Sequence, residues 1–277
     1  MSRELRLRII SGIVMAVVVL AATWQGGFAF RLLASLIGLL IYYEWSTITK
    51  LYERDFPGAA LGWLGLVVIV VATLAEESVY AVGALLVFSV LSAALVAVRR
   101  KSWWLPGGIV YAGLTVIAMA EIRDEDLRGF VLMLFVFATV WSTDILAYFV
   151  GRAIGGPKLA PRISPGKTWS GAIGGAVAAI IIGPAVVWGF FPGIGFGVAL
   201  VALVLSICSQ VGDLFESFIK RRFGVKDSSH LIPGHGGVMD RADGLVFACF
   251  AAFLLAIVLS LMAGGETSSL GGVLLGV

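Results

Sequence analysis

Nine apolar stretches divide the chain, and each is long enough to cross about 30 Å of hydrocarbon as a helix. The segments between them are short and hold most of the charged residues. This pattern predicts an all-α, polytopic transmembrane helical protein with about nine spans. The predicted spans cover approximately residues 9–26, 32–47, 59–74, 79–98, 104–120, 129–150, 169–190, 195–215 and 244–262.

Composition points to the same class of protein. Of the 277 residues, 60% are apolar and 13% are charged, with a mean hydropathy of +1.01, whereas soluble domains are about half apolar and a quarter charged. No stretch has the mixed composition of a water-facing domain, so we expect a single membrane domain over residues 1–277. The spans within residues 1–127 carry few chemical motifs, and most candidate motifs fall within residues 128–277.

The positions of the cationic residues predict the orientation of the spans. Segments that stay in the cytosol carry an excess of Lys and Arg, and alternate segments here hold 17 of the 20 basic residues. We therefore expect a cytosolic N-terminus, an external C-terminus and a functional site that faces the cytosol. The formal net charge of +3 is too small to indicate a nucleic-acid partner. The partner that composition predicts is the lipid bilayer.

Ionisable residues inside spans are costly and mark functional sites by default. Asp144 shares a helix face with Tyr148 and Arg152 through spacings of four residues. Asp213 lies in a polar stripe of the eighth span, together with Ser206, Ser209, Gln210 and Ser217. The structural alternatives are an ion pair between Asp144 and an Arg of a neighbouring helix, and hydrogen bonds that join helices along the stripe.

Asp240 and Asp243 are three residues apart where the ninth span begins, so both carboxylates project from one side of its first turn. Helix capping readily explains one of them, but three neighbouring carboxylates, Asp213 included, need a cation to offset their repulsion. We therefore predict a divalent-metal site at Asp213, Asp240 and Asp243. Glu44, near the end of the second span, is interpreted as a snorkelling or paired surface carboxylate and is left out of the site.

The linker between the eighth and ninth spans combines cations, hydroxyls and glycines. Lys and Arg neutralise phosphate oxygens, and glycines let backbone amides approach them, so the linker favours a polyphosphate site. Contact with anionic lipid headgroups is the alternative. Loop histidines more often make hydrogen bonds than transfer protons, so we expect His235 to position other groups and assign no role to His230.

A second polar segment, Ser164-Pro-Gly-Lys-Thr168, ends like a phosphate-binding P-loop. The Walker pattern requires a glycine where this chain has Pro161, and no soluble strand precedes the segment. It is therefore not a P-loop. Lys167, Thr168 and the start of the seventh span can still hold phosphate, because helix N-termini attract anions.

Together these motifs resemble the phosphatidate cytidylyltransferases, also called CDP-diglyceride synthetases. The resemblance covers the chain from Asp144 onward, and the N-terminal five spans match in hydrophobic character alone. Gly166 stands where the family pattern has a second lysine, and Ser170 where it has a glutamate. The segments that carry the resemblance are Asp144-Ile-Leu-Ala-Tyr148-Phe-Val-Gly151-Arg152, Lys158 to Thr168, Gln210-Val-Gly212-Asp213-Leu-Phe-Glu216-Ser217, Lys220-Arg221, Lys226-Asp227 and His235-Gly236-Gly237-Val-Met-Asp240-Arg241-Ala-Asp243.

The resemblance implies transfer of CMP from CTP to phosphatidate, which forms CDP-diacylglycerol and pyrophosphate in phospholipid biosynthesis. It makes residues 128–277 the catalytic half and predicts a location in a bacterial inner (plasma) membrane. The expected cofactor is Mg²⁺ at the three aspartates, alone or beside a second cation. Expected catalytic residues are Lys220, Arg221, Lys226, His235 and Arg241. Expected substrate-binding residues are Asp144, Lys167, Thr168, Ser217, Gly236 and Gly237. A homodimer is compatible with the sequence, which does not specify one.

Two rival functions share some of these features. A CDP-alcohol phosphotransferase has the Asp-x-x-Asp-Gly opening found from Asp240 to Gly244, but it needs two further spaced aspartates, and no acidic residue follows here until Glu266. An ion-coupled transporter also places carboxylates and glycine-broken helices in the membrane. It should show repeat symmetry and midplane charges, whereas these acids cluster at one face. The transporter is the alternative function.

Overall fold

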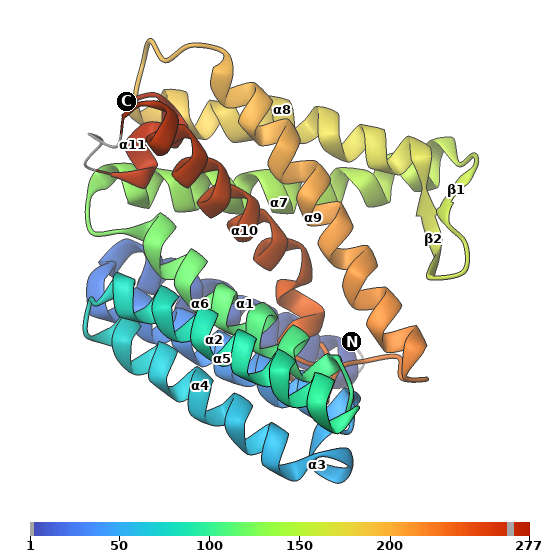
Figure 1. Ribbon diagram of the computed structural model, residues 1–277. Helices are drawn as coiled ribbons and strands as arrows, with labels where there is room; N and C mark the ends of the chain where they lie inside the picture. Colours follow the sequence, from blue (N-terminus) through green and yellow to red (C-terminus); the bar gives the residue numbers. More distant parts are fainter. Residues whose placement is uncertain (1–2, 265–268) are drawn as a thin grey trace. The chain divides into compact units, whose positions relative to one another are not determined.

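The computed structural model describes residues 3–264 and 269–277 and divides into two compact units (Figure 1). Unit 1 contains the chain up to Glu121 together with Arg222–Arg241, and unit 2 contains Ile122–Arg221 and Ala242–Val277. Within the described residues, nine helices are long and apolar enough to span a membrane. The predicted helical, polytopic fold and its number of spans are thus confirmed, while the orientation and the single domain stay predictions.

Unit 1 is largely formed by the helices of the N-terminal half. They are α1 (Arg3–Gln25), α2 (Gly27–Ile48), the single turn α3 (Leu51–Arg54), α4 (Phe56–Leu74), α5 (Ser78–Arg99) and α6 (Trp104–Arg123). Asp55 caps α4, since its carboxylate accepts a hydrogen bond from the Gly58 amide. The short α3 was not predicted from the sequence.

Trp45 of α2 organises the core of unit 1. Its indole Nε1 donates a 2.8 Å hydrogen bond to the Trp104 carbonyl, and its ring lies 5.5 Å from that of Tyr111. A Cβ added at Gly108 would come within 2.6 Å of the Trp45 ring. Glycine therefore lets α6 pack directly against this large side chain, as small residues do at helix contacts in membranes.

Unit 2 consists of the remaining helices and one short hairpin. Its elements are α7 (Leu127–Ile154), β1 (Lys158–Ala160), β2 (Ser164–Thr168), α8 (Trp169–Phe190), α9 (Gly197–Arg222), most of α10 (Met239–Met262) and α11 (Leu270–Leu275). β1 and β2 pair antiparallel, with Lys158 opposite Thr168 and Ala160 opposite Ser164. The all-α prediction, with a loop over this segment, misses the hairpin. α11 was also not predicted.

Helices α7 and α8 lie side by side through a seam of small residues (Figure 1). A Cβ added at Gly171 would lie 2.6 Å from the Ala147 carbonyl oxygen and 3.2 Å from the Gly151 Cα. Two glycines, Gly151 and Gly171, therefore meet at a close approach of the two helices. The seam brings the start of α8 and the hairpin that precedes it against the last turns of α7.

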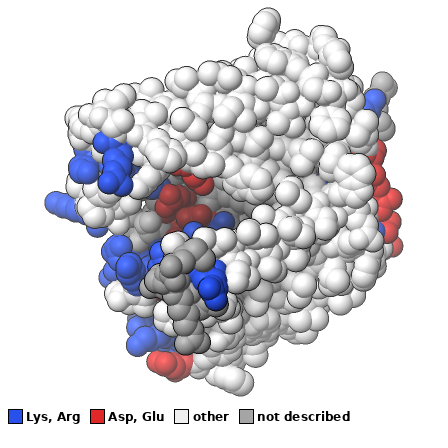
Figure 2. All heavy atoms as spheres, turned by 180° about the vertical axis from the view of Figure 1, so that it is seen from behind, with Lys and Arg blue, Asp and Glu red and all other residues white. Residues whose placement is uncertain are grey.

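Many large apolar side chains lie on the surface, among them Val98 at 83% exposed and Leu261 at 71%. Much of the face drawn in Figure 2 carries no Lys, Arg, Asp or Glu. Contiguous apolar surface of this kind is rare on soluble monomers. It is the surface that a lipid-embedded helical protein presents to hydrocarbon.

Candidate active site

Unit 2 contains a cavity of about 580 Å³ formed by α7, the β1–β2 hairpin, α8 and α9. We call it the aspartate cavity. Asp144, Tyr148 and Arg152 contribute to its wall from one face of α7, as their spacing predicts. Other polar lining residues are Lys158, Lys167, Thr168, Gln210 and Asp213. Four residues predicted to bind substrate or metal, Asp144, Lys167, Thr168 and Asp213, therefore line one cavity.

The Lys167 ammonium group forms an ion pair with the carboxylate of Asp213 inside this cavity. Both side chains are partly exposed, at 26% and 33%. Lys167 lies on β2 and Asp213 on α9, so the hairpin supplies the cation and the helix the anion. The Ser217 hydroxyl, one turn further along α9, lies 3.5 Å from the other Asp213 oxygen.

Two residues of the polar stripe of α9 form hydrogen bonds with neighbouring helices of unit 2. The Ser206 hydroxyl lies 2.8 Å from that of Thr143 on α7, and Gln210 Nε2 donates to the Ala172 carbonyl on α8 at 3.3 Å. These bonds join helices, which is the structural alternative considered for the stripe. Asp213, by contrast, reaches the cavity.

Three carboxylates of unit 2 interact electrostatically. Asp243 is repelled by Asp213 and by Asp144, and Lys220 offsets part of this negative charge. Lys220 also forms a 2.6 Å ion pair with the buried Glu216, one turn earlier on α9, a pairing that was not predicted from the sequence. Arg221, next on the helix, is exposed.

The donor chemistry of these carboxylates suits a divalent cation, because Mg²⁺ prefers oxygen ligands. The Lys167 ammonium group against Asp213 shows that a positive charge is accommodated there. Within residues 3–264 and 269–277, no group of three or more His, Cys, Asp or Glu side chains is arranged closely enough to hold a metal ion. The assignment of Asp213, Asp240 and Asp243 as ligands stays a prediction.

The hairpin and the start of α8 contain Thr168 and the two residues that depart from the family pattern, Gly166 and Ser170. The Thr168 hydroxyl caps α8 by accepting a 3.1 Å hydrogen bond from the Gly171 amide. Ser170 Oγ donates to the Gly155 carbonyl at 2.5 Å and so ties the start of α8 to the end of α7. No atom lies within 4 Å of a Cβ built at Gly166, so this position has room for a larger side chain.

Unit 1 contains a second polar cavity, of about 700 Å³, which we call the basic cavity. Most of its wall belongs to the connection between α9 and α10, residues 223–238, which we call the His-Gly-Gly loop. Its lining residues are Arg8, Lys226, Asp227, His230, Ile232, Pro233, Gly234, His235, Gly236 and Arg241. Four predicted site residues, Lys226, His235, Gly236 and Arg241, therefore share this cavity. Arg8 of α1 joins them, although its charge served only to predict orientation from the sequence.

His235 is held by hydrogen bonds within unit 1. Its Nδ1 lies 2.8 Å from the Ser11 hydroxyl of α1, and its carbonyl accepts a 3.1 Å hydrogen bond from Arg241 Nε. Partial burial lowers the pKa of His235 below its ordinary value, and the positive charges of Arg241 and Arg8 lower the pKa further. These contacts fit the positioning role expected for His235, and no sequence signal identified Ser11.

Asp240 braces the His-Gly-Gly loop from the first turn of α10. Its Oδ2 accepts hydrogen bonds from the Ser228 amide at 2.7 Å, the Ser228 hydroxyl at 2.8 Å and the Gly237 amide at 2.8 Å. Gly236 has a φ of +83°, which favours glycine, and a Cβ there would lie 2.7 Å from Asp240 Oδ2. Asp240 therefore has a structural role in the loop in addition to the predicted metal ligation.

The interpretation of Glu44 as a surface carboxylate is wrong. Its exposure is 0%, and its oxygens accept hydrogen bonds from the Ser228 hydroxyl, the Ser229 hydroxyl and two backbone amides of unit 1. One sequence feature could have identified Glu44 as a site residue, because an ionisable residue in an apolar stretch is a functional candidate by default. Its partners lie almost 200 residues later in the chain, so no local pattern reveals them.

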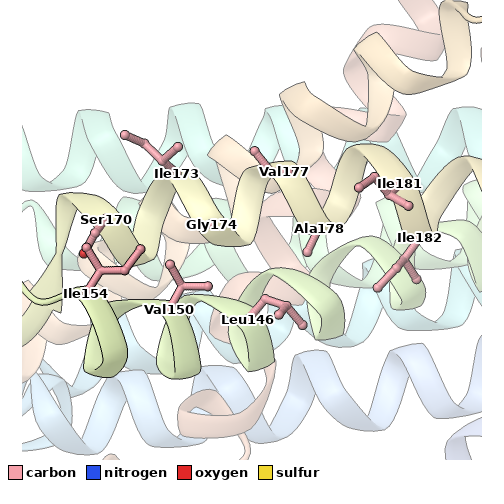
Figure 3. Close-up of a pocket in the computed structure, with 10 residues that line it drawn as sticks. All are labelled: Leu146, Val150, Ile154, Ser170, Ile173, Gly174, Val177, Ala178, Ile181 and Ile182. Atoms are coloured by element: carbon pink, nitrogen blue, oxygen red, sulfur yellow. The ribbon is translucent and has the colours of Figure 1, made fainter.

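An apolar groove of about 570 Å³ lies between α7 and α8 (Figure 3). Leu146, Val150 and Ile154 line it from α7, and residues of α8 such as Ala178 and Ile182 extend toward them. Ser170 is its one hydroxyl-bearing lining residue. A groove of this composition can accept hydrocarbon but offers no charge to a phosphate.

Comparison with known proteins identifies the family. Residues 6–260 match the model of the Cytidylyltransferase family. The chain is 45% identical over 256 residues to the phosphatidate cytidylyltransferase of Brucella abortus biovar 1 (strain 9-941), an alignment that covers 91% of this chain and 93% of that protein. It is 32% identical over 272 residues to the phosphatidate cytidylyltransferase of Bacillus subtilis (strain 168), with 92% and 98% covered. This chain therefore belongs to the cytidylyltransferase family.

Proposed function

We propose that this protein transfers CMP from CTP to phosphatidate, forming CDP-diacylglycerol and pyrophosphate. The observation that carries the proposal is the near-full-length similarity to proteins named phosphatidate cytidylyltransferase, at 45% identity over 91% of the chain. The two polar cavities add the chemistry that such substrates need. Lys167 and Arg152 line one of them, and Lys226 and Arg241 line the other.

The reaction exchanges one phosphoanhydride bond for another. An oxygen of the phosphatidate phosphate attacks the α-phosphorus of CTP, and the bond from that phosphorus to the oxygen bridging to the β-phosphorus breaks. Pyrophosphate leaves with the electron pair. No covalent bond to the protein is needed, so catalysis consists of positioning and charge neutralisation.

The basic residues neutralise the phosphates in this proposal. Lys220, Arg221, Lys226 and Arg241 offset charge on the departing pyrophosphate or the lipid headgroup, while Lys167 and Thr168 contact phosphate at the start of α8. His235 positions the loop that carries Lys226, and its carbonyl accepts a hydrogen bond from Arg241. Arg8 adds a further cation to the basic cavity.

The cofactor of the proposed reaction is Mg²⁺, held by the carboxylates of Asp213, Asp240 and Asp243. When bound, the ion would offset negative charge on the nucleotide phosphates. The carboxylate oxygens suit this ion, and Lys167 already offsets charge at Asp213. Phosphate binding through Lys167 would compete with this ion pair.

The protein is proposed to lie in a bacterial inner membrane, with the functional loops in the cytosol, where CTP is present. The bias of Lys and Arg towards alternate segments supports this orientation. Single cysteines would test it in a background with Cys208→Ala and Cys249→Ala. Lys101→Cys and Pro165→Cys should react with an impermeant maleimide only after the membrane is opened, and Glu125→Cys should react in intact cells. The reverse pattern would refute the orientation.

Pyrophosphate release separates this function from the ion-coupled transporter. Purified protein in detergent with CTP and Mg²⁺ should release pyrophosphate only when phosphatidate is added. A transporter would release none under either condition. Omission of phosphatidate also serves as the control for nonspecific hydrolysis of CTP.

A further inference from the structure

Glu44 is a fully buried carboxylate of α2 that accepts hydrogen bonds from residues 228, 229, 238 and 239, which belong to one short stretch of the chain. Its Oε1 accepts hydrogen bonds from the Ser229 hydroxyl at 2.6 Å and the Val238 amide at 2.8 Å. Its Oε2 accepts hydrogen bonds from the Ser228 hydroxyl at 2.9 Å and the Met239 amide at 2.7 Å. One side chain therefore joins both ends of the segment that contains the His-Gly-Gly sequence.

A buried carboxylate is stable only when hydrogen bonds replace the water that it loses. Here four donors do so, and two of them are backbone amides at the start of α10. Negative charge is favourable at this end of a helix. Glu44 thus fixes where α10 begins, and with it the first turn that carries Asp240.

Ser228 connects Glu44 to Asp240. Its hydroxyl lies 2.9 Å from Glu44 Oε2 and 2.8 Å from Asp240 Oδ2. A hydroxyl has one proton to donate, so the two carboxylates share this single donor. A change in the charge of Glu44 therefore alters the hydrogen bonding of Asp240, a predicted metal ligand.

The same contacts explain the second glycine of the His-Gly-Gly sequence. A Cβ added at Gly237 would lie 2.6 Å from the carboxylate carbon of Glu44. A side chain at this position would push Glu44 away from its donors. Gly237 is thus required by the packing of Glu44, whether or not its amide also approaches a phosphate.

We propose that Glu44 is a positioning residue for the reaction, which holds the His-Gly-Gly loop and the first turn of α10 in the arrangement that turnover requires. The inference rests on the proposed function, because the residues that Glu44 orders are assigned to phosphate and metal binding there. Glu44 itself contacts no reacting atom in this proposal. It acts through Ser228, Ser229 and the two amides.

Glu44→Gln tests the proposal, since it keeps the size of the side chain but replaces one acceptor oxygen by a donor. We expect kcat/KM for CTP per folded protein to fall roughly tenfold or more, because small displacements of catalytic groups have large effects on rate. The Mg²⁺ concentration for half-maximal activity should rise. Glu44→Asp keeps the charge and should restore part of the loss. Glu53→Gln, at an exposed position of α3, is the matched control and should behave like the wild type.

Limited trypsin digestion supplies a readout that does not depend on activity. Lys226 lies exposed in the loop, so Glu44→Gln should be cut after Lys226 faster than the wild type, and Glu53→Gln should not. Wild-type protein that lacks activity would refute the proposed function. The rate of cleavage after Lys226 would even then show whether Glu44 holds the loop in place. Unchanged cleavage and unchanged kcat/KM in folded Glu44→Gln would overturn the inference alone.

A double-mutant cycle with Ser229→Ala covers the case in which Glu44→Gln gives little folded protein. Ser229→Ala removes one donor to Glu44 and should lower kcat/KM by a smaller factor, roughly threefold, in line with the loss of one hydrogen bond. Glu44→Asp with Ser229→Ala should lose less than the product of the single effects, since the two residues act together. Wild-type kcat/KM in Ser229→Ala, or effects that simply multiply, would contradict the proposal.

Discussion

Lys167 on β2 and Asp213 on α9 form an ion pair inside the aspartate cavity. The pair brings a residue of the Ser164 to Thr168 segment against a residue of the α9 polar stripe, two features that the sequence presents separately. Because each side chain is partly exposed, incoming phosphate can compete with the carboxylate for the lysine. We therefore expect substitutions of Lys167 and Asp213 to affect substrate binding more than other substitutions in the cavity do.

Lys167→Met should lower turnover roughly 100-fold, the effect typical of removing one group that stabilises developing charge. Lys167→Arg, which keeps the charge, should lose less. Initial rates of CDP-diacylglycerol formation, normalised to folded protein, provide the measurement. Arg162→Met, an exposed change between β1 and β2, is the matched control. Wild-type turnover in Lys167→Met would remove this lysine from the site.

Asp213→Asn, Asp240→Asn and Asp243→Asn should each reduce turnover by roughly 100-fold or more, because loss of a metal ligand forfeits several kcal/mol of charge stabilisation. Folded yield should change little. Asn caps helices about as well as Asp, so a capping role alone predicts mild effects. Asp126→Asn is the control for that role, since Asp126 caps α7 by accepting a 2.7 Å hydrogen bond from Gly129. Near-normal activity in both Asp240→Asn and Asp243→Asn would refute metal ligation by α10.

The lowered pKa of His235 predicts a loss of stability in mild acid. The unfolded side chain has a pKa of about 6.5 and binds protons at a pH where the folded one does not. The stabilising contribution is therefore complete above about pH 6.5 and is lost as pH falls through the folded pKa. Other ionisable groups that line the same cavity are Arg8, Lys226, Asp227, His230 and Arg241.

Thermal melting of purified protein at pH 7.5 and at pH 5.5 measures this effect of His235. Between pH 7.5 and pH 5.5, the melting temperature of the wild type should fall by more than that of His235→Gln. The difference between the two proteins isolates His235 from the other titrating groups. An equal loss in both proteins would show that His235 does not contribute to the pH dependence.

The close packing of α7 against α8 predicts that one methyl group added at Gly171 lowers the stability of the protein markedly. Gly171→Ala should destabilise the protein by about 1–3 kcal/mol, the usual range for overpacking, because its Cβ would meet the Ala147 carbonyl oxygen at 2.6 Å. Gly189→Ala, in the same helix, meets no atom within 4 Å and serves as the control. Melting temperatures of the two variants in detergent give the comparison. Equal melting temperatures would contradict the packing described for the seam.

The fold was predictable because hydrophobic span length depends on local sequence alone. The nine spans follow from about 20 consecutive apolar residues each, and Asp144, Tyr148 and Arg152 share a cavity wall because helix periodicity places them on one face. The β1–β2 hairpin was missed because strands of three and five residues leave no clear alternation in the sequence. Residues 158–168 also contain two prolines and one glycine, residue types that are depleted in strands.

The partners of the site residues were harder to predict than the residues themselves. Glu44 was set aside because its sequence neighbours place it near the end of a span, while its four donors come from residues 228–239. Ser11 contacts His235 across a similar separation. Such pairs depend on how distant segments pack, and single-sequence patterns do not contain that information.

Stoichiometric product formation by purified protein is the most direct test of the proposed transfer of CMP to phosphatidate. Protein in detergent would be incubated with CTP labelled in the cytidine, phosphatidate and Mg²⁺, and labelled lipid and pyrophosphate would be measured together. We expect equal amounts of CDP-diacylglycerol and pyrophosphate, no product without phosphatidate, and little product in EDTA or with Asp213→Asn. Folded wild-type protein that forms no labelled lipid under these conditions would contradict the proposal.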